Sequence, residues 1–257
     1  MRIVDTHCHA GLLKYEPVES LLYHMETSGV SQAVLIQYGG NSDNSYLVDC
    51  LQRHPGRFAA AMIVDPADDG TAMRRWAEAG LTGIRLGVES RARAADPLAH
   101  WRTADELGLV VSAVSTPEQM LSPEFLEVLD TFPELSICIE HLASVGRAET
   151  DAEYRKGLDE IAHRPNLSMK LPGFGEFCLG PMPWDPIPPV ARLALEAFGP
   201  ERLMWGSDFP PVSGREGYHN SLRVPLDYFS DLGDADRESI FGGAARAVWD
   251  LPPLPQA

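Results

Sequence analysis

The chain alternates short, nearly continuous apolar segments with longer amphipathic stretches. A short apolar run is typical of a strand that is covered on both faces, as in a parallel sheet. Eight such runs occur along the sequence: Ile3–His7, Ala33–Gln37, Phe58–Val64, Gly83–Val88, Leu109–Val114, Leu135–His141, Leu167–Leu171 and Leu203–Ser207. We interpret them as eight buried strands.

The stretches between these runs carry helix start and stop signals. Glycine follows several of them, as at Gly29, Gly80 and Gly108, and proline opens or closes others. The predicted helices are Val18–Ser28, Asp43–His54, Thr71–Ala79, Pro97–Leu107, Pro117–Phe132, Asp151–His163, Pro188–Phe198 and Tyr218–Phe229, with one more at Asp234–Trp249.

Eight strand–helix pairs in sequence predict an α/β fold, a (β/α)8 TIM barrel with an extra C-terminal helix. We expect one domain over residues 1–250 and a short tail over residues 251–257. The alternative is an open doubly wound sheet. The count of eight and the lack of a glycine-rich phosphate loop after the first strand favour the barrel.

Composition narrows the classes of partner. The length of 257 residues suits one barrel, and a net charge of −16 disfavours binding to nucleic acid or to anionic membranes. We therefore expect a small-molecule substrate, with a homodimer as the working oligomeric state. The four cysteines show no CxxC spacing, which favours a reducing, cytoplasmic setting. No signal peptide or membrane span is expected, because Met1–Asp5 leads directly into a strand and no apolar run approaches ~20 residues.

The first strand ends in two histidines, His7 and His9. Functional groups of a barrel collect at the C-terminal ends of its strands. Residues i and i+2 of a strand point the same way, so these two imidazoles can converge on one metal ion. The alternative, that both are merely hydrogen-bonded polar groups, is less favoured for a pair than for a single histidine.

Two further strands end in residues of the same kind. His141 ends the sixth strand and Asp208 follows the eighth. A carboxylate there can bind a metal, deprotonate a water, or do both. Taken singly, His141 could make a loop hydrogen bond and Asp208 could cap a turn. Their joint occurrence with the paired histidines favours a site.

Two cations interrupt apolar strands, Arg85 in the fourth and Lys170 in the seventh. Burying an unpaired cation is costly, so each either pairs with a barrel carboxylate such as Asp5 or Glu140 or reaches an anionic substrate. Both readings stay open. Trp184 and Phe174, after the seventh strand, could wall a pocket or form a hydrophobic plug. The helical histidines His24, His54, His100 and His163 are expected at the surface.

These motifs together resemble the amidohydrolase-2 family, and within it the lactonase branch. The resemblance covers essentially the whole chain and rests on Asp5–His9, Gly83–Leu86, Ile139–Leu142, Met169–Gly173 and Arg202–Pro210. It implies a hydrolase that opens a lactone or similar ester of a small, often carboxylated substrate.

The resemblance also implies roles for single residues. Asp208 would be the general base, with His141 beside it as a catalytic residue. His7, His9 and Asp208 would hold one divalent metal ion, by expectation zinc, although some relatives need no metal. Arg85, Lys170 and His141 would bind substrate.

Departures from the family pattern limit this reading. The fourth strand offers Arg85 where metal-rich relatives have a carboxylated lysine, so a binuclear centre is not expected. The fifth strand, Leu109–Val114, lacks the usual histidine, and Pro172 replaces a serine. The missing histidine also weighs against the main alternative, a non-oxidative decarboxylase of an aromatic or unsaturated acid. A non-catalytic ligand-binding barrel is a third hypothesis.

Overall fold

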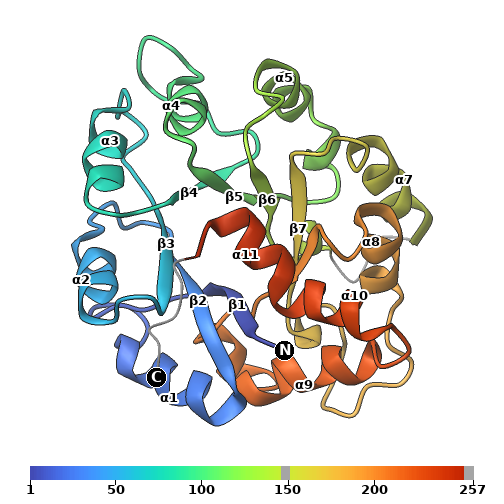
Figure 1. The fold of residues 1–257 in the computed structure, drawn as a ribbon. Coiled ribbons are helices and arrows are strands. Elements are labelled where there is room, and N and C mark those ends of the chain that lie inside the picture. The colour runs from blue at the N-terminus through green and yellow to red at the C-terminus, as the bar shows by residue number, and fades with distance from the viewer. Residues whose placement is uncertain (146–150, 252–257) are drawn as a thin grey trace.

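The computed structural model describes residues 1–145 and 151–251. Within them, eight strands form one parallel sheet in the order β1-β2-β3-β4-β5-β6-β7-β8, with a ring of helices outside (Figure 1). The strands are β1 (Ile3–Cys8), β2 (Val30–Ile36), β3 (Phe58–Met62), β4 (Gly83–Gly87), β5 (Val110–Val114), β6 (Ile137–Ile139), β7 (Leu167–Leu171) and β8 (Leu203–Trp205). The predicted (β/α)8 barrel is confirmed.

The sheet closes between its first and last strands. The amide of Asp208 donates to the carbonyl of His7 at 2.7 Å, and the amide of His9 donates to the carbonyl of Phe209 at 2.7 Å. Below this point the Thr6 hydroxyl donates to the Trp205 carbonyl. Closure therefore joins His7, His9 and Asp208 through the backbone.

The barrel interior is layered because side chains alternate in and out along each strand. A lower layer of mostly small or apolar residues packs inside, including Val4, Val34, Ala61, Val110 and Cys138. The outward residues pack against the helices in the larger core. One pleat above the lower layer, the inward positions turn polar.

A β-bulge in β1 sets the direction of His7. Asp5 pairs with Ala33 but Cys8 pairs with Leu35, so three steps along β1 match two along β2. Bulges re-aim side chains and occur often beside active sites. Here the bulge lets both Val4 and His7 face the interior although they are three residues apart.

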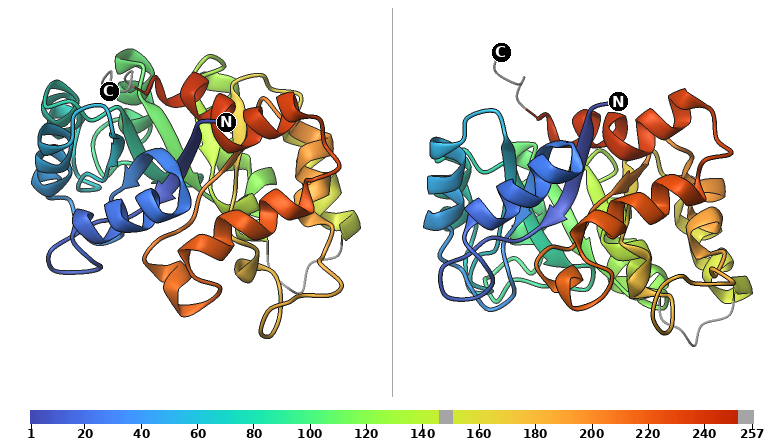
Figure 2. Two further views of the ribbon diagram at one scale, coloured as in Figure 1. Left: turned by 60° about the horizontal axis from the view of Figure 1, so that its bottom comes forward. Right: turned by 90° about the horizontal axis from the view of Figure 1, so that it is seen from below.

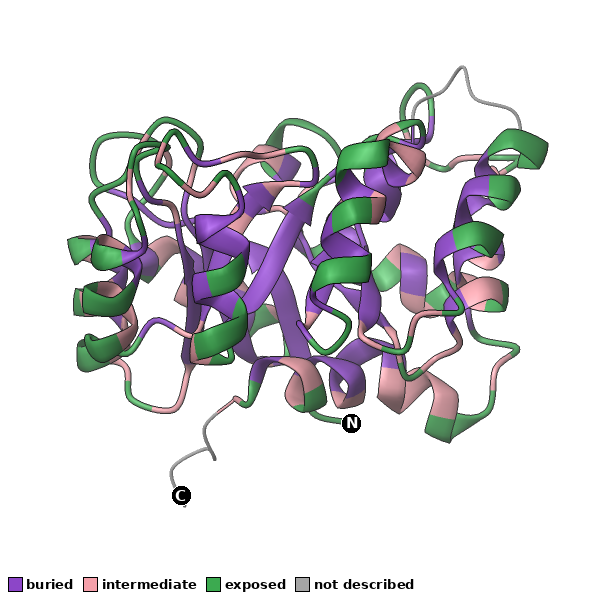
Figure 3. Ribbon diagram, turned by 90° about the horizontal axis from the view of Figure 1, so that it is seen from above, coloured by how far each residue is buried: buried purple, intermediate pink, exposed green. Residues whose placement is uncertain are grey.

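Helices cover the barrel on the outside, and their solvent-facing residues are exposed (Figure 3). They are α1 (Val18–Ser28), α2 (Ser45–Arg53), α3 (Thr71–Glu78), α4 (Ala99–Leu107), α5 (Pro123–Thr131), α7 (Asp151–Ile161), α8 (Val190–Phe198) and α9 (Tyr218–Tyr228). Among the described residues, no helix is both long and apolar enough to cross a membrane.

Some predicted boundaries are wrong. The helix expected over Pro117–Phe132 is split into a 3-10 turn, η1 (Gln119–Leu121), and α5. Pro123 cannot donate a backbone hydrogen bond, and the Ser122 hydroxyl accepts from the Phe125 amide to start a new helix. β2 begins earlier than expected, at Val30. Of the expected tail, residues 252–257 lie outside the described part of the chain.

The last segment that the structure describes closes the bottom of the barrel, the end at which the strands begin. It runs through α10 (Asp234–Glu238), a π-helical turn η4 (Ser239–Gly243) and α11 (Ala244–Trp249). α11 lies across the end of the barrel where β1 begins (Figure 1), and the side views place the loops after the strands at the opposite end (Figure 2). Trp249 is fully buried in the lower layer.

We predict that Trp249→Ala lowers the free energy of unfolding by about 3–5 kcal/mol, because it leaves a large cavity in a packed interior. Denaturant unfolding followed by circular dichroism measures the change. Trp76→Ala is the control, since Trp76 is only partly buried on α3 and should cost clearly less. Equal losses of unfolding free energy in the two variants would show that Trp249 is not a tightly packed part of the barrel interior.

Candidate active site

The polar layer of the barrel interior brings the predicted site residues together. Four of them meet at the C-terminal end of the strands, which we call the mouth of the barrel, at the end opposite α11: His7, His9, His141 and Asp208. His9 Nε2 lies 3.4 Å from Asp208 Oδ1, and His7 Nε2 lies 3.8 Å from the same oxygen. The imidazole in β1, the imidazole just after it and the carboxylate after β8 are thus within contact distance of one another.

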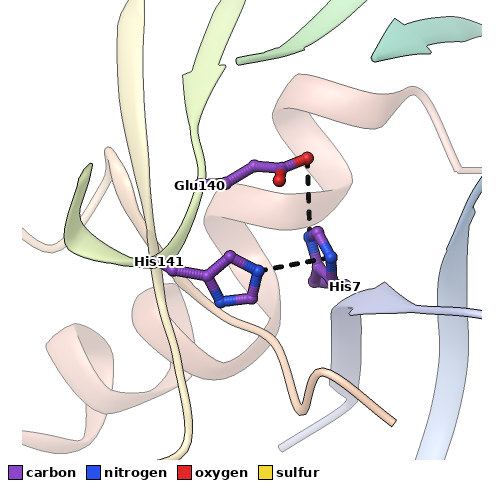
Figure 4. Close-up of side chains that lie close together, drawn as sticks. All are labelled: His7, Glu140 and His141. Carbon is purple, nitrogen blue, oxygen red and sulfur yellow. Dashed lines mark hydrogen bonds and ion pairs between the residues drawn. The ribbon is translucent and has the colours of Figure 1, made fainter. Parts of the chain in front are cut away.

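His141 completes the group from the side of β6. Its Nε2 lies 3.3 Å from His7 Nε2, and its Nδ1 lies 3.1 Å from Glu176 Oε1 (Figure 4 shows His7, His141 and Glu140). Burial disfavours the imidazolium form, but the nearby carboxylates of Glu176 and Asp208 outweigh burial and raise the pKa of His141. His141 is therefore a candidate hydrogen-bond donor in the mouth.

The backbone at two of these residues is unusual. His141 opens a segment, α6 (His141–Ser144), in which all four residues have positive φ, between 50° and 59°. Asp208 also has positive φ, 58°. The left-handed region costs a non-glycine residue roughly 1 kcal/mol or more. Such strain concentrates at functional sites, and here it falls on two of the four candidate residues.

Ionisation of Asp208 is favoured by its neighbours. Burial alone would raise the pKa of this carboxyl, but the hydrogen bond with His9 and the charge of His141 lower it. The reverse holds for His7, whose pKa lies well below its usual range because burial and the charges of His141 and Lys170 disfavour a second proton. The site thus combines a carboxylate with a neutral imidazole.

The donor set suits a single divalent cation. His7, His9 and Asp208 each offer one ligand atom, and the three atoms lie within 4.8 Å of one another. His9 Nδ1 lies 2.6 Å from the Ile36 carbonyl, which can only accept, so Nδ1 carries a proton. A metal bound here would take the lone pair of His9 Nε2 in place of the contact between Nε2 and Asp208. Two nitrogens and a carboxylate are ligands that zinc accepts. His7, Glu140 and His141 form a second possible group.

Below His7 lies a buried network of charges. Arg85 donates to both oxygens of Glu140, its Nη2 at 2.7 Å from Oε2. Lys170 Nζ donates to the Ser112 hydroxyl at 2.6 Å, and Ser112 in turn donates to Glu140 Oε1 at 2.6 Å. Burial would raise the pKa of Glu140, but Arg85 and Lys170 overcome it and hold the pKa at about 2.

The two cations of the strands have different surroundings in the structure. Arg85 pairs with Glu140, the first of its two predicted alternatives, and its side chain is still 19% exposed. Lys170 is fully buried, with Nζ 3.2 Å from His7 Nδ1 and 5.5 Å from the centre of the Trp249 ring. This geometry favours a role for Lys170 beneath His7 over direct contact with substrate.

Sequence reasoning missed several residues of this site. Glu176 follows β7 in the turn η2 (Phe174–Glu176), and Arg215 follows β8 just after η3 (Pro211–Gly214). Arg215 Nη2 lies 3.3 Å from Asp208 Oδ2 and 3.3 Å from Glu176 Oε1. Charged residues in loops are common, and no periodic signal marked these two.

Asp5 binds two of the segments that carry the site residues. Its carboxylate accepts from the amide and the hydroxyl of Ser207, at 2.9 and 2.6 Å, and from the amide of His7 at 3.1 Å. Burial raises the pKa of Asp5 to about 6 despite these hydrogen bonds. Asp5 thus ties β1 to the segment after β8 instead of pairing with a strand cation.

Two expectations outside the site can be corrected or resolved. His100 was expected at the surface but is buried, because its Nε2 binds the Asp68 carbonyl at 2.8 Å beneath the loop before α3. Phe174 is fully buried against Phe177 and behaves as a hydrophobic plug. Trp184, in contrast, is partly exposed.

Comparison with solved structures supports the fold. An amidohydrolase from Burkholderia multivorans with bound zinc superposes with a TM-score of 0.80, at 22% identity, over 98% of this chain and 100% of that one. At this identity the likeness shows the barrel and no more.

Sequence comparison gives the family. An L-fucono-1,5-lactonase of Burkholderia ambifaria is 29% identical over 85% of this chain and 79% of its own length. A 4-sulfomuconolactone hydrolase of Rhizobium radiobacter is 28% identical over 82% of this chain and 70% of its own. The family model described as amidohydrolase matches residues 4–251. The chain therefore belongs to the amidohydrolase family of hydrolases.

Proposed function

We propose that this hydrolase opens a lactone, or a similar ester, of a small and carboxylated substrate. The observation that carries the proposal is the convergence of His7 Nε2 and His9 Nε2 on one oxygen of Asp208, within 3.8 Å. The similarity to two enzymes named for lactones supports this choice of substrate class.

The proposed reaction is attack of water on the lactone carbonyl. Asp208 takes one proton from the water as the new C–O bond forms, which its lowered pKa allows at neutral pH. His141, held by Glu176, donates a hydrogen bond to the carbonyl oxygen and stabilises the oxyanion. When the intermediate collapses, the ring C–O bond breaks and Asp208 returns the proton to the leaving oxygen, which yields a hydroxy acid.

His7, His9 and Asp208 would hold a divalent metal, with zinc as the proposed ion. Bound there, such an ion would supply Lewis acidity toward the carbonyl oxygen. His9 is oriented for this role by the Ile36 carbonyl. A cytoplasmic location is part of the same proposal and is supported by the absence of CxxC spacing.

The decarboxylase alternative is less well supported. It calls for a histidine on β5, but the inward residue of β5 at this level is Ser112, whose hydroxyl already bonds Glu140 and Lys170. A panel of lactones and aromatic acids, assayed with and without a chelator, separates the two reactions. Release of carbon dioxide without lactone opening would overturn the proposal.

We predict that Asp208→Asn lowers kcat for lactone opening at least ~100-fold, because an amide cannot accept the proton from water. Steady-state kinetics measures the loss, and circular dichroism checks that the fold is intact. Asp159→Asn is the control, since Asp159 is an exposed residue of α7. Near-normal activity in Asp208→Asn would remove Asp208 from the role of general base.

A second prediction concerns the metal. His7→Ala should lose most of any bound divalent ion, because one of three clustered ligand atoms disappears. Elemental analysis of the purified variant beside the wild type gives the answer, with His163→Ala, an exposed residue, as control. If His7→Ala keeps full metal content, the ligands lie elsewhere.

A third prediction distinguishes support of His7 from direct substrate binding by Lys170. Lys170→Met keeps the volume of the side chain but removes the donor to Ser112 and the contact with His7 Nδ1. We expect kcat to fall roughly 10–100-fold, as for other residues behind an active-site histidine, with little change in KM. Lys156→Met, at an exposed position of α7, is the control. A rise in KM alone would restore Lys170 as a direct substrate contact.

A further inference from the structure

A cavity of about 400 Å³ opens between the loops that follow β7 and β8. Its lining includes Pro181, Met182, Trp184, Gly214, Arg215 and Glu216. The volume lies in the range of small-molecule sites. The lining combines apolar side chains, such as Met182 and Trp184, with the charged Arg215 and polar backbone. None of the catalytic roles proposed above uses this cavity.

Arg215 joins the cavity to the mouth of the barrel. It lines the cavity, and its Nη2 lies 3.3 Å from Asp208 Oδ2. A substrate whose carbonyl sits beside Asp208 can therefore place another group against Arg215, and the rest of its body in the cavity. The side chain of Arg215 is 27% exposed, so it is accessible to a ligand.

The pairing of Arg215 is loose. Its contacts with Asp208, Glu176 and Glu216 are 3.3, 3.3 and 3.6 Å, whereas strong guanidinium–carboxylate pairs lie at about 2.7–2.9 Å. Arg85, in contrast, binds Glu140 through two of its nitrogens, at 2.7 and 3.1 Å. An incoming carboxylate therefore competes for Arg215 more easily than for Arg85.

The backbone that presents Arg215 is held firmly. The side chain of Glu216 is fully buried and accepts from the Gly175 amide at 3.1 Å. A Cβ at Gly173 or Gly175 would come within 2.2 or 2.0 Å of the Glu216 carboxylate oxygens, so only glycine leaves room for it. Glu216 thus fastens the loop after β8 to the loop after β7, and this presents Arg215 in one place.

We propose that Arg215 anchors an anionic group of the substrate and that the adjoining cavity receives the part of the substrate that lies beyond this group. The substrate class is then a lactone with a carboxylate beside a larger substituent, which rests on the proposed function of the site. Arg215 is here a specificity residue, and it takes over the anchoring role that the sequence suggested for Arg85.

The first test is turnover of a matched pair, a carboxylated lactone and its neutral methyl ester. Arg215→Gln should raise KM for the carboxylated lactone roughly 10–100-fold, the usual effect of losing a charged hydrogen bond, with a change under about threefold for the ester. Arg215→Lys should recover part of the loss. Arg223→Gln is the control, because Arg223 is 67% exposed on α9 and pairs with Asp227. An equal fall in kcat for both substrates would overturn the proposal and make Arg215 a support of Asp208.

The second test measures binding without chemistry. Benzoate and benzamide have the same shape but differ in charge, and calorimetry gives a Kd for each. Wild type should prefer benzoate, and Arg215→Gln should lose the preference. Equal binding of both probes to wild type would overturn the proposal. If no lactone is opened but the preference for benzoate holds, the proposed function fails while the anionic subsite stands.

The third test narrows the cavity. Gly214 lines it, and a Cβ there would meet no atom within 4 Å. Gly214→Leu should therefore lower kcat/KM for substrates with a bulky substituent at least about tenfold relative to their unsubstituted parents. Gly233→Leu, at a position with similar open space before α10, is the control. No change in this preference would remove the cavity from substrate recognition.

Discussion

The compensation of charge around Glu140 is the interaction on which the site depends. A carboxylate in the dry interior of a barrel is tolerated only when cations and hydrogen bonds satisfy it, and Arg85 and Ser112 do so directly. Lys170 joins through Ser112 and reaches His7. The imidazole of His7 thus lies above an ordered network in which two cations compensate one carboxylate. The same contacts therefore position the reacting groups and stabilise the barrel interior.

The sequence predicted the parts of the site that follow from strand ends. His7, His141 and Asp208 could be found because the C-terminal ends of parallel strands converge in a barrel. How deeply a side chain is buried inside the barrel could not be predicted from the positions of strand ends. Arg85 and Lys170 look alike as cations in apolar strands, but in the fold Arg85 pairs with Glu140 and stays partly exposed, whereas Lys170 is fully buried beside His7. The bulge in β1 left no mark in the pattern of residues either.

The loops after β7 and β8 were the least predictable part and carry the recognition proposed above. Their conformation depends on contacts between segments distant in sequence, such as the space that Gly173 and Gly175 leave for the side chain of Glu216. No local periodicity reports such contacts. The division is physically reasonable, because strands hold the reacting groups rigidly while loops can vary without disturbing the core.

The position of α11 at the bottom of the barrel affects when the active site forms during folding. Trp249 lies under Lys170, and Ser207 fastens Asp5, so elements from opposite ends of the described chain complete the same chamber. Contacts of such large sequence separation form late, since the intervening polypeptide must first be ordered. During synthesis, the catalytic pocket would take shape only after α11 has left the ribosome.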